Sequence, residues 1–171
     1  MGCIFLIGFM AAGKSTIGKA LSTLLGASFL DIDTEVERRE GIPIHRIFSK
    51  KGEPYFRKLE ATILREFGSS CGGETSIIAT GGGLPCTGGN MEYMNERGIT
   101  VYLKSSIDDI MSRVEHIRDR PVFQQIGSRN GLEELLWKRE PYYSSAHLTI
   151  ENRNDITPQQ IAEHIARVFT Q

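Results

Sequence analysis

The fold of this chain is decided by the stretch Gly8-Phe9-Met10-Ala11-Ala12-Gly13-Lys14-Ser15, which has the pattern G-x-x-x-x-G-K-S of a phosphate-binding loop. The apolar residues 3–7 before it predict a buried parallel strand, and a helical pattern follows it. In such a unit, backbone N–H groups and the positive end of the helix surround an anion. Lys14 then reaches the terminal phosphates and the Ser15 hydroxyl can bind Mg²⁺. The stretch predicts a site for a nucleoside triphosphate, whereas a chance glycine-rich turn would lack both flanks.

Two alanines of this stretch occupy positions at which some phosphate-binding loops carry glycine. They are Ala11 and Ala12. Only glycine adopts positive φ angles without a steric cost, so a loop built with alanine is expected to avoid them. We therefore expect an ordinary negative φ at both residues.

Length and composition limit the classes of protein to consider. The 171 residues suit one domain, 1–171, with a full hydrophobic core. A net charge of −1, from 20 basic and 21 acidic residues, attracts neither nucleic acid nor an anionic membrane. The N-terminal apolar run is too short to span a bilayer and lacks a basic leader. Cys3, Cys71 and Cys86 form no C-x-x-C pair and no even framework, which predicts a reducing, cytoplasmic location.

The hydrophobic pattern along the chain predicts five strands that alternate with helices. The strands are expected at residues 3–7, 28–30, 76–79, 100–103 and 148–150. A helix after the phosphate loop ends near Gly26, and others are expected at residues 34–41, 43–51, 54–67, 91–97, 107–114, around 132–143 and from 158 onward. This order predicts an α/β fold, a three-layer sandwich in which helices cover both faces of a five-stranded, mostly parallel sheet.

Polar and glycine-rich segments follow two of these strands, at the sheet edge where open α/β folds bind ligands. Asp31 and Asp33 end the second strand and share one side if the chain stays extended. Alternatively, Asp33 only caps the helix beginning at residue 34. Residues 81–83 are three glycines directly after the third strand, which indicates a sharp bend or a close approach to a ligand. A flexible surface turn is the alternative.

Several arginines lie outside the phosphate loop and suggest a second, anionic ligand. Arg57 and Glu60 share a helix face at i, i+3, where a solvated ion pair is the simpler interpretation. Arg139 belongs to the helix around 132–143, and residues 115–130 form a charged, arginine-bearing connector that can close over a phosphate site or remain a solvated loop. The guanidinium group binds a carboxylate through two parallel hydrogen bonds. We therefore expect phosphoryl transfer to a carboxylate-bearing acceptor.

Six motifs in this order resemble those of the shikimate kinase family, and together they cover nearly the whole chain. They are Gly13-Lys14-Ser15-Thr16, Asp31-x-Asp33, Phe56-Arg57-x-x-Glu60, Ala79-Thr80-Gly81-Gly82-Gly83, Arg118-Asp119-Arg120-Pro121 and Lys138-Arg139-x-Pro141-x-Tyr143. The resemblance implies a P-loop fold of the nucleoside-monophosphate-kinase kind, with an acceptor-binding region at about 32–67 and a lid at about 115–129. It implies transfer of the γ-phosphoryl group of ATP to the 3-hydroxyl of shikimate, in chorismate and aromatic amino acid biosynthesis. It also implies a monomer.

The resemblance assigns acceptor-binding roles residue by residue. Arg57 and Arg139 match the arginines that hold the shikimate carboxylate. Asp33 matches the aspartate that contacts the ring hydroxyls and is the candidate to accept a proton. Glu60 matches an acid that orients Arg57, and the backbone lining the ring corresponds to Gly81, Gly82 and Gly83.

The resemblance also assigns the nucleotide side. Ser15 and Asp31 match the residues around Mg²⁺, partly through water, and Arg120 matches the lid arginine that reaches the phosphates. Arg113 and Arg153 match the arginines that flank the adenine, with a loose local match at Arg153. The remaining ATP contacts are expected from Gly8, Ala11, Ala12, Gly13, Lys14, Ser15 and Thr16.

Two departures from the family pattern and two competing functions accompany this interpretation. Leu84-Pro85-Cys86 follows the glycines where the family usually has a small and then an aliphatic residue, and Ala11 replaces a common glycine. Pro85 lacks a backbone N–H group, so the pocket wall after Gly83 is expected to take a different path.

The competing functions are a kinase for another carboxylated polyol such as gluconate, and an ATP-binding regulator without transferase activity.

Overall fold

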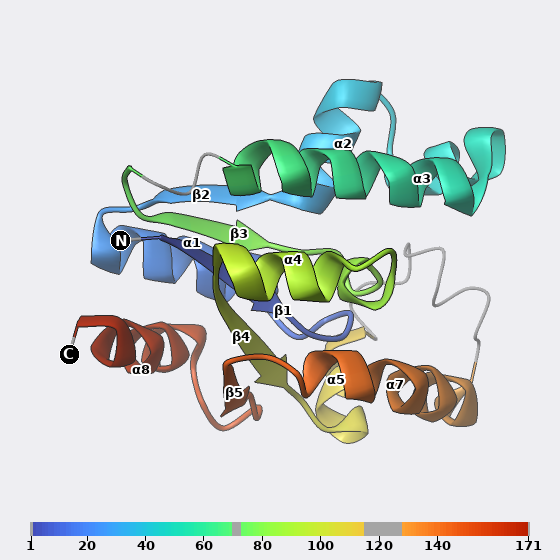
Figure 1. Cartoon of the computed structure of the whole chain (residues 1–171). Helices are drawn as coiled ribbons and strands as arrows, with labels where there is room; N and C mark the ends of the chain where they lie inside the picture. Colours follow the sequence, from blue (N-terminus) through green and yellow to red (C-terminus); the bar gives the residue numbers. More distant parts are fainter. Residues whose placement is uncertain (1, 70–72, 115–127, 171) are drawn as a thin grey trace.

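A five-stranded parallel sheet forms the centre of the computed structural model, which describes residues 2–69, 73–114 and 128–170 (Figure 1). The strand order is β2-β3-β1-β4-β5, and every pairing between neighbouring strands is parallel. The strands are β1 (Cys3–Ile7), β2 (Ser28–Asp31), β3 (Ser76–Ala79), β4 (Gly98–Lys104) and β5 (Leu148–Glu151). The expected strands and parallel sheet are confirmed.

Helices cover both faces of the sheet because its central strand is apolar on both sides. Cys3, Phe5 and Ile7 of β1 enter one core cluster, and Ile4 and Leu6 enter the other. The second cluster packs against α1 (Lys14–Leu25) and α8 (Pro158–Thr170). The first packs against α2 (Ile32–Glu40), α3 (Ile44–Ser69), α4 (Asn90–Arg97), α5 (Ile107–Val114) and α7 (Arg129–Tyr143). The three-layer sandwich is therefore confirmed.

The start of α2 differs from the expectation. The helix begins at Ile32, two residues earlier than predicted, and Asp31 caps it by accepting a hydrogen bond from the backbone N–H of Thr34 at 3.1 Å. Asp33 consequently lies in the first helical turn, so the chain through Asp31 and Asp33 is not extended. The alternative in which Asp33 caps a helix from residue 34 is wrong, because Asp31 has that role.

The other helix boundaries follow local signals in the sequence. Gly52 has φ 79° and ψ 165°, which are non-helical, and this kink separates the two helical pieces that were expected on either side of it. At the start of α8, Thr157 and Gln160 form a reciprocal capping box, with the N–H of Thr157 donating to Oε1 of Gln160 at 2.9 Å.

The cysteines bear out only part of the expectation drawn from them. Cys86 is a free thiol in the 3₁₀ turn Leu84–Cys86, whereas Cys3 is disulfide-bonded. The cysteines by themselves therefore do not decide the redox compartment.

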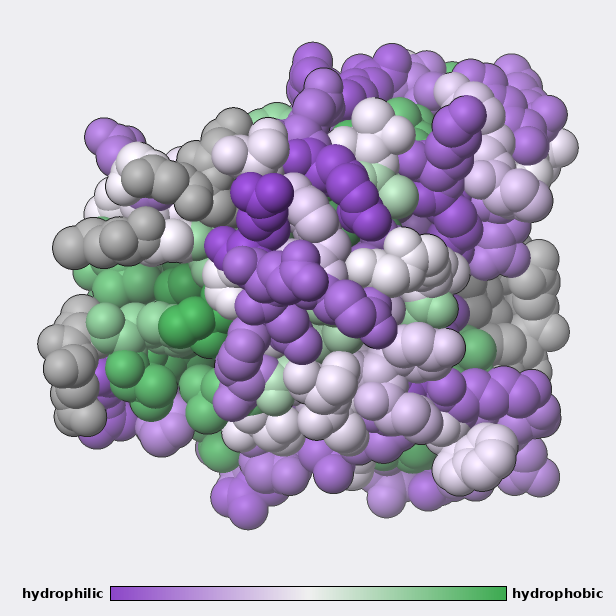
Figure 2. Space-filling model, in the orientation of Figure 1, coloured by the Kyte–Doolittle hydropathy of each residue, from purple (hydrophilic) through white to green (hydrophobic). Residues whose placement is uncertain are grey.

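The molecular surface in this view is mainly hydrophilic. Figure 2 shows hydrophobic residues gathered on the side where the N terminus and α8 lie, and polar residues over most of the remaining face. Within residues 2–69, 73–114 and 128–170, no helix combines the length and the hydrophobicity that crossing a membrane requires.

Candidate active site

The phosphate loop connects the carboxyl end of β1 to α1 and is held by its glycines. Gly8 has φ 140°, and a Cβ there would lie 2.7 Å from the carbonyl oxygen of Leu103. Gly13 has φ 70° and precedes the first residue of α1. Lys14 is 8 % exposed, and its Nζ donates to the carbonyls of Gly8 at 2.9 Å and Phe9 at 2.8 Å. The ammonium group is thus held over the loop in which a phosphate would bind.

The two alanines of the loop have different conformations. Ala11 has φ 58°, so the expectation of a negative φ at this residue is wrong. The loop requires a left-handed residue here, and the carbonyl of Ala11 accepts a hydrogen bond from Nη1 of Arg113 at 3.3 Å. Ala12 has no positive φ, is 1 % exposed, and its carbonyl accepts from Nδ2 of Asn152 at 2.7 Å. The expectation holds for Ala12 only.

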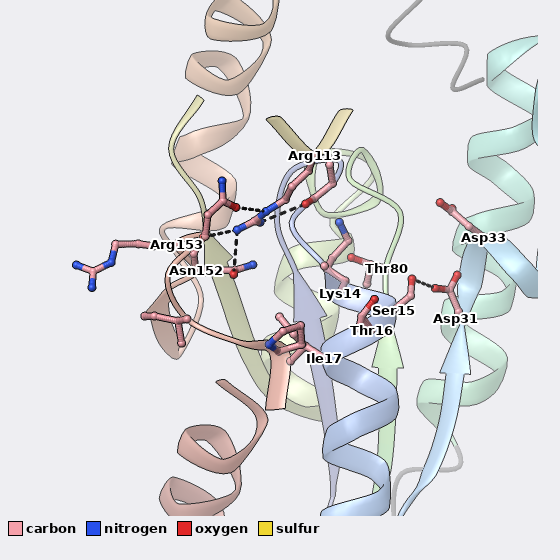
Figure 3. Close-up of a pocket in the computed structure, with 15 residues that line it drawn as sticks. Lys14, Ser15, Thr16, Ile17, Asp31, Asp33, Thr80, Arg113, Asn152 and Arg153 are labelled. Atoms are coloured by element: carbon pink, nitrogen blue, oxygen red, sulfur yellow. Dashed lines mark hydrogen bonds between the residues drawn. The ribbon is translucent and has the colours of Figure 1, made fainter. Parts of the chain in front are cut away.

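A pocket of about 410 Å³ opens beside this loop (Figure 3). The expected nucleotide-binding residues that line it are Ala11, Gly13, Lys14, Ser15, Thr16, Arg113 and Arg153. Gly8 and Ala12 do not line it, because Gly8 packs against β4 and the Ala12 side chain belongs to the core. A pocket of this size and position can accept a nucleotide.

The two expected adenine-flanking arginines differ in orientation. Arg113 reaches across the pocket edge, where its guanidinium donates to Ser105, Asn152 and Asn154 in addition to Ala11. Arg153 instead pairs with Asp155 at 3.0 Å, and in Figure 3 its guanidinium points away from the phosphate loop. Only Arg113 is therefore already directed at the loop.

Ser15 and Asp31 meet at the inner end of the nucleotide pocket. The Ser15 hydroxyl donates to Oδ2 of Asp31 (Figure 3). The other carboxylate oxygen of Asp31 caps α2. Hydroxyl and carboxylate oxygens are the hard ligands that Mg²⁺ prefers. No cluster of three or more His, Cys, Asp or Glu side chains suited to a metal occurs in the described part of the chain. This donor set fits a Mg²⁺ ion completed by water and substrate phosphates, because that ion seldom uses an all-protein cage.

A second pocket, of about 250 Å³, adjoins the first. Among the residues that line it are all seven of the expected acceptor-binding residues: Asp33, Arg57, Glu60, Gly81, Gly82, Gly83 and Arg139. Ser15, Asp31 and Asp33 line both pockets. The tertiary structure therefore brings the arginines of α3 and α7 to the carboxyl edge of the sheet, next to the phosphate loop.

Glu60 is the deepest charged group of the second pocket. It is fully buried, and its Oε2 accepts from Nη1 of Arg57 at 2.7 Å. Oε1 of Glu60 has no hydrogen-bond partner among the described residues. Burial raises the pKa of Glu60 to about 7, against the opposing effect of Arg57 and with a further contribution from the charge of Asp33. Glu60 therefore orients Arg57 from a site that poorly tolerates a second negative charge.

At residues 81–83, glycine is needed because neighbouring side chains lie too close to the backbone for a Cβ. It is not needed for a positive φ angle. A Cβ at Gly81 would lie 2.3 Å from Oε1 of Glu60 and 2.7 Å from Oδ1 of Asp33. A Cβ at Gly83 would lie 2.6 Å from Cζ of Arg57. None of the three has a positive φ, but the chain does turn here, with the N–H of Leu84 donating to the carbonyl of Gly81 at 3.2 Å. The expected bend is therefore present and is made without left-handed residues. After them, residues 84–86 form a 3₁₀ turn in which Leu84 is fully buried.

Several residues of the two pockets were not anticipated. Asn152 and Asn154 follow β5 at the same sheet edge as the aspartates, so the rule that drew attention to Asp31 would also have found them. The second pocket also includes residues that carry no such signal, namely Met10, Thr34, Glu37, Ile44, His45 and Phe48. Phe56, which lines it too, was noted only as part of the motif with Arg57 and Glu60. The expected lid at 115–129 and its Arg120 lie, except for the last two positions, outside the described residues.

The geometry agrees with what a comparison of sequences shows. The sequence model of the shikimate kinase family matches residues 10–170. This chain belongs to the shikimate kinase family. The resemblance drawn from the six motifs is therefore confirmed.

Individual members of the shikimate kinase family match over nearly their full length. A shikimate kinase from Nitrosospira multiformis is 38 % identical over 170 residues, which cover 99 % of this chain and 85 % of that protein. One from Parabacteroides distasonis is 39 % identical over 165 residues, covering 92 % of both chains. The structure of a shikimate kinase from Acinetobacter baumannii in complex with shikimate has a TM-score of 0.92 and 37 % identity, covering 99 % of this chain and 93 % of that one. The predicted P-loop kinase fold is thus confirmed.

Proposed function

We propose that this chain is a shikimate kinase, which transfers the γ-phosphoryl group of ATP to the 3-hydroxyl of shikimate. Membership of the shikimate kinase family supports the reaction type, and the Acinetobacter baumannii relative of the same fold has been crystallised with shikimate. The observation that carries the proposal is the junction of the two pockets. Ser15, Asp31 and Asp33 line both, so a triphosphate in one pocket faces an acceptor in the other.

The acceptor pocket has the charge pattern that a hydroxylated carboxylic acid requires. Arg57 and Arg139 supply guanidinium groups for the acceptor carboxylate, and the arginine–carboxylate pair gives orientation as well as affinity. Glu53 and Glu60 hold Arg57 from two sides, at 2.8 Å and 2.7 Å. Arg57 is thus held in place by two carboxylates, whereas Arg139 forms no ion pair with a carboxylate among the described residues.

Asp33 and Lys14 have complementary roles in the transfer step. The Asp33 carboxylate aligns the 3-hydroxyl and accepts its proton as the new oxygen–phosphorus bond forms. The bond between the γ-phosphorus and the bridging oxygen then breaks, and ADP leaves. Lys14 exchanges its bonds to the loop carbonyls for phosphate oxygens, where its charge stabilises the transition state.

The remaining assignments complete the proposal. Ser15 and Asp31 would hold Mg²⁺, which supplies positive charge to the phosphate oxygens when it is bound. Arg113 and Arg153 would flank the adenine, and Arg120 of the lid at 115–129 would reach the transferring phosphate. The acceptor-binding region corresponds to residues 32–67 within a single kinase domain. We also propose a cytoplasmic monomer.

A coupled assay of ADP release across a panel of hydroxy acids tests this function. Shikimate is expected to be the acceptor that supports turnover, and gluconate is not. A result in which gluconate replaces shikimate would favour another polyol kinase, and ATP binding without acceptor-dependent ADP release would favour a regulator.

The variant Arg139→Ala tests the acceptor pocket in the same assay. It is expected to weaken acceptor binding by about 2–5 kcal/mol, because the carboxylate of the bound acceptor loses its arginine partner inside the pocket. The KM for ATP is expected to change much less. Arg97→Ala is a matched control, since Arg97 packs over the Tyr93 ring on α4, away from both pockets. Equal losses of affinity for both substrates would contradict the role of Arg139.

A further inference from the structure

Phe9 of the phosphate loop contacts both halves of the site. Its carbonyl accepts a hydrogen bond from Nζ of Lys14 at 2.8 Å, which ties it to the nucleotide side. Its ring, 2 % exposed, lies 5.6 Å from Cζ of Arg139, measured to the ring centroid. A guanidinium within about 6 Å of an aromatic ring is attracted to its face. One residue therefore contacts both the lysine that moves to the phosphates and an arginine of the acceptor pocket.

The space around this contact is closely packed. A Cβ at Gly82 would lie 3.3 Å from the backbone nitrogen of Met10, and 3.4 Å from both Nη1 of Arg139 and the carbonyl oxygen of Gly8. The hydroxyl of Tyr143 donates to the carbonyl of Gly82 and holds it against the loop. Because packed interiors transmit small shifts, a movement of the Phe9 segment reaches Arg139.

We propose that Phe9 is a positioning residue that couples nucleotide binding to acceptor binding. Lys14 donates to the carbonyls of Gly8 and Phe9 in this structure, and its ammonium group would bond to the phosphate oxygens of a bound nucleotide instead. When the Lys14 ammonium group moves to the phosphates, the Phe9 carbonyl loses a charge-assisted hydrogen bond. The ring of the same residue supports Arg139. This inference rests on the proposed function, since it takes the second pocket to be the acceptor site.

Coupling of this kind has measurable and reciprocal consequences. If the nucleotide changes the acceptor Kd by a given factor, the acceptor changes the nucleotide Kd by the same factor. Typical coupling factors are about 5- to 150-fold. Loss of the ring at Phe9 removes a cation–π contact, and acceptor affinity is expected to fall about 2- to 30-fold. The coupling factor is expected to fall toward one.

Phe56 provides a matched control. Its ring lies 5.2 Å from Cζ of the other acceptor arginine, Arg57, and it is 3 % exposed. It belongs to α3, whereas the carbonyls that accept hydrogen bonds from Lys14 at Gly8 and Phe9 belong to the phosphate loop. Phe56→Leu is therefore expected to weaken acceptor binding but to leave the coupling factor at the native value.

Calorimetric titration measures the coupling factor directly. Shikimate is titrated into the native chain, Phe9→Leu and Phe56→Leu, each with and without a non-hydrolysable ATP analogue and Mg²⁺. The expected result is a native factor of about fivefold or more, a factor within about twofold of one in Phe9→Leu, and a native factor in Phe56→Leu. A native factor of one, native coupling in Phe9→Leu, or equal loss of coupling in both variants would overturn the proposal.

Two further measurements keep the outcome decisive. Urea unfolding verifies that each variant is folded, and Phe9→Met, which keeps an apolar side chain of similar size, replaces Phe9→Leu if that variant does not fold. If the native chain did not bind shikimate at all, the proposed function itself would be refuted. A native chain that binds shikimate but shows no role for Phe9 in the coupling would refute only this inference.

Discussion

The two adjacent alanines of the phosphate loop should respond with opposite signs to the same substitution. Ala11 has φ 58°, a left-handed conformation that costs a residue with a Cβ about 1–2 kcal/mol. Glycine avoids this cost but gains about 0.4–1 kcal/mol of conformational freedom in the unfolded chain. Ala11→Gly is therefore expected to raise the free energy of unfolding by about 0.8 kcal/mol, the difference between the central values of the two effects.

Ala12 provides the matched comparison. It has no positive φ, and its methyl group is 1 % exposed within the core cluster on α1. Ala12→Gly removes a buried carbon worth about 0.8 kcal/mol and adds the same unfolded-state freedom. The free energy of unfolding is expected to fall by about 1.2–1.8 kcal/mol.

Urea unfolding without nucleotide measures both effects, and thermal unfolding checks the sign. In a chain of this length, 1 kcal/mol corresponds to about 2–4 °C in Tm. The reasoning would be refuted if Ala11→Gly were destabilising by as much as Ala12→Gly. That result would mean that Ala11 does not hold a left-handed conformation in solution.

Three more predictions follow from the geometry of the site. Lys14→Ala is expected to lower kcat at least about 100-fold, because charge stabilisation of the transferring phosphate is lost; steady-state kinetics measures this. Gly83→Ala places a Cβ 2.6 Å from the Arg57 guanidinium, so the KM for the acceptor should rise about tenfold or more. The free energy of unfolding measured in urea should change by less than about 1 kcal/mol, because only the flexible end of the Arg57 side chain must move. The pKa of Glu60 is about 7 in the folded chain and 4.5 in the reference state, so its contribution to stability is present below pH 4.5 and is lost as the pH rises to 7. Glu60→Gln should flatten the decline of the unfolding free energy between these pH values.

Each of the three has an outcome that contradicts it. Near-native turnover of Lys14→Ala would place the phosphates elsewhere. An unchanged acceptor KM in Gly83→Ala would mean that Arg57 does not need its observed position. An identical pH dependence of stability in the native chain and Glu60→Gln would show that Glu60 does not titrate in this range.

Local patterns in the sequence were sufficient for the architecture and for many, but not all, of the residues that line the two pockets. The strands, the phosphate loop and the capping box of α8 are each encoded within a few neighbouring residues, so periodicity and spacing predict them. The parallel order of elements also places Asp31, the glycines and the phosphate loop at one edge of the sheet, since every strand of a parallel sheet ends there.

Conformations and contacts that depend on distant residues were decided only by the tertiary structure. The sequence treats Ala11 and Ala12 alike, yet Ala11 is left-handed with its carbonyl bonded to Arg113, and Ala12 is buried with its carbonyl bonded to Asn152. The contact of Phe9 with Arg139 joins residues 130 positions apart in the chain and has no local signature. A residue's own preferences set its local structure, but its φ, burial and partners in a packed site are chosen by whatever the rest of the fold places beside it.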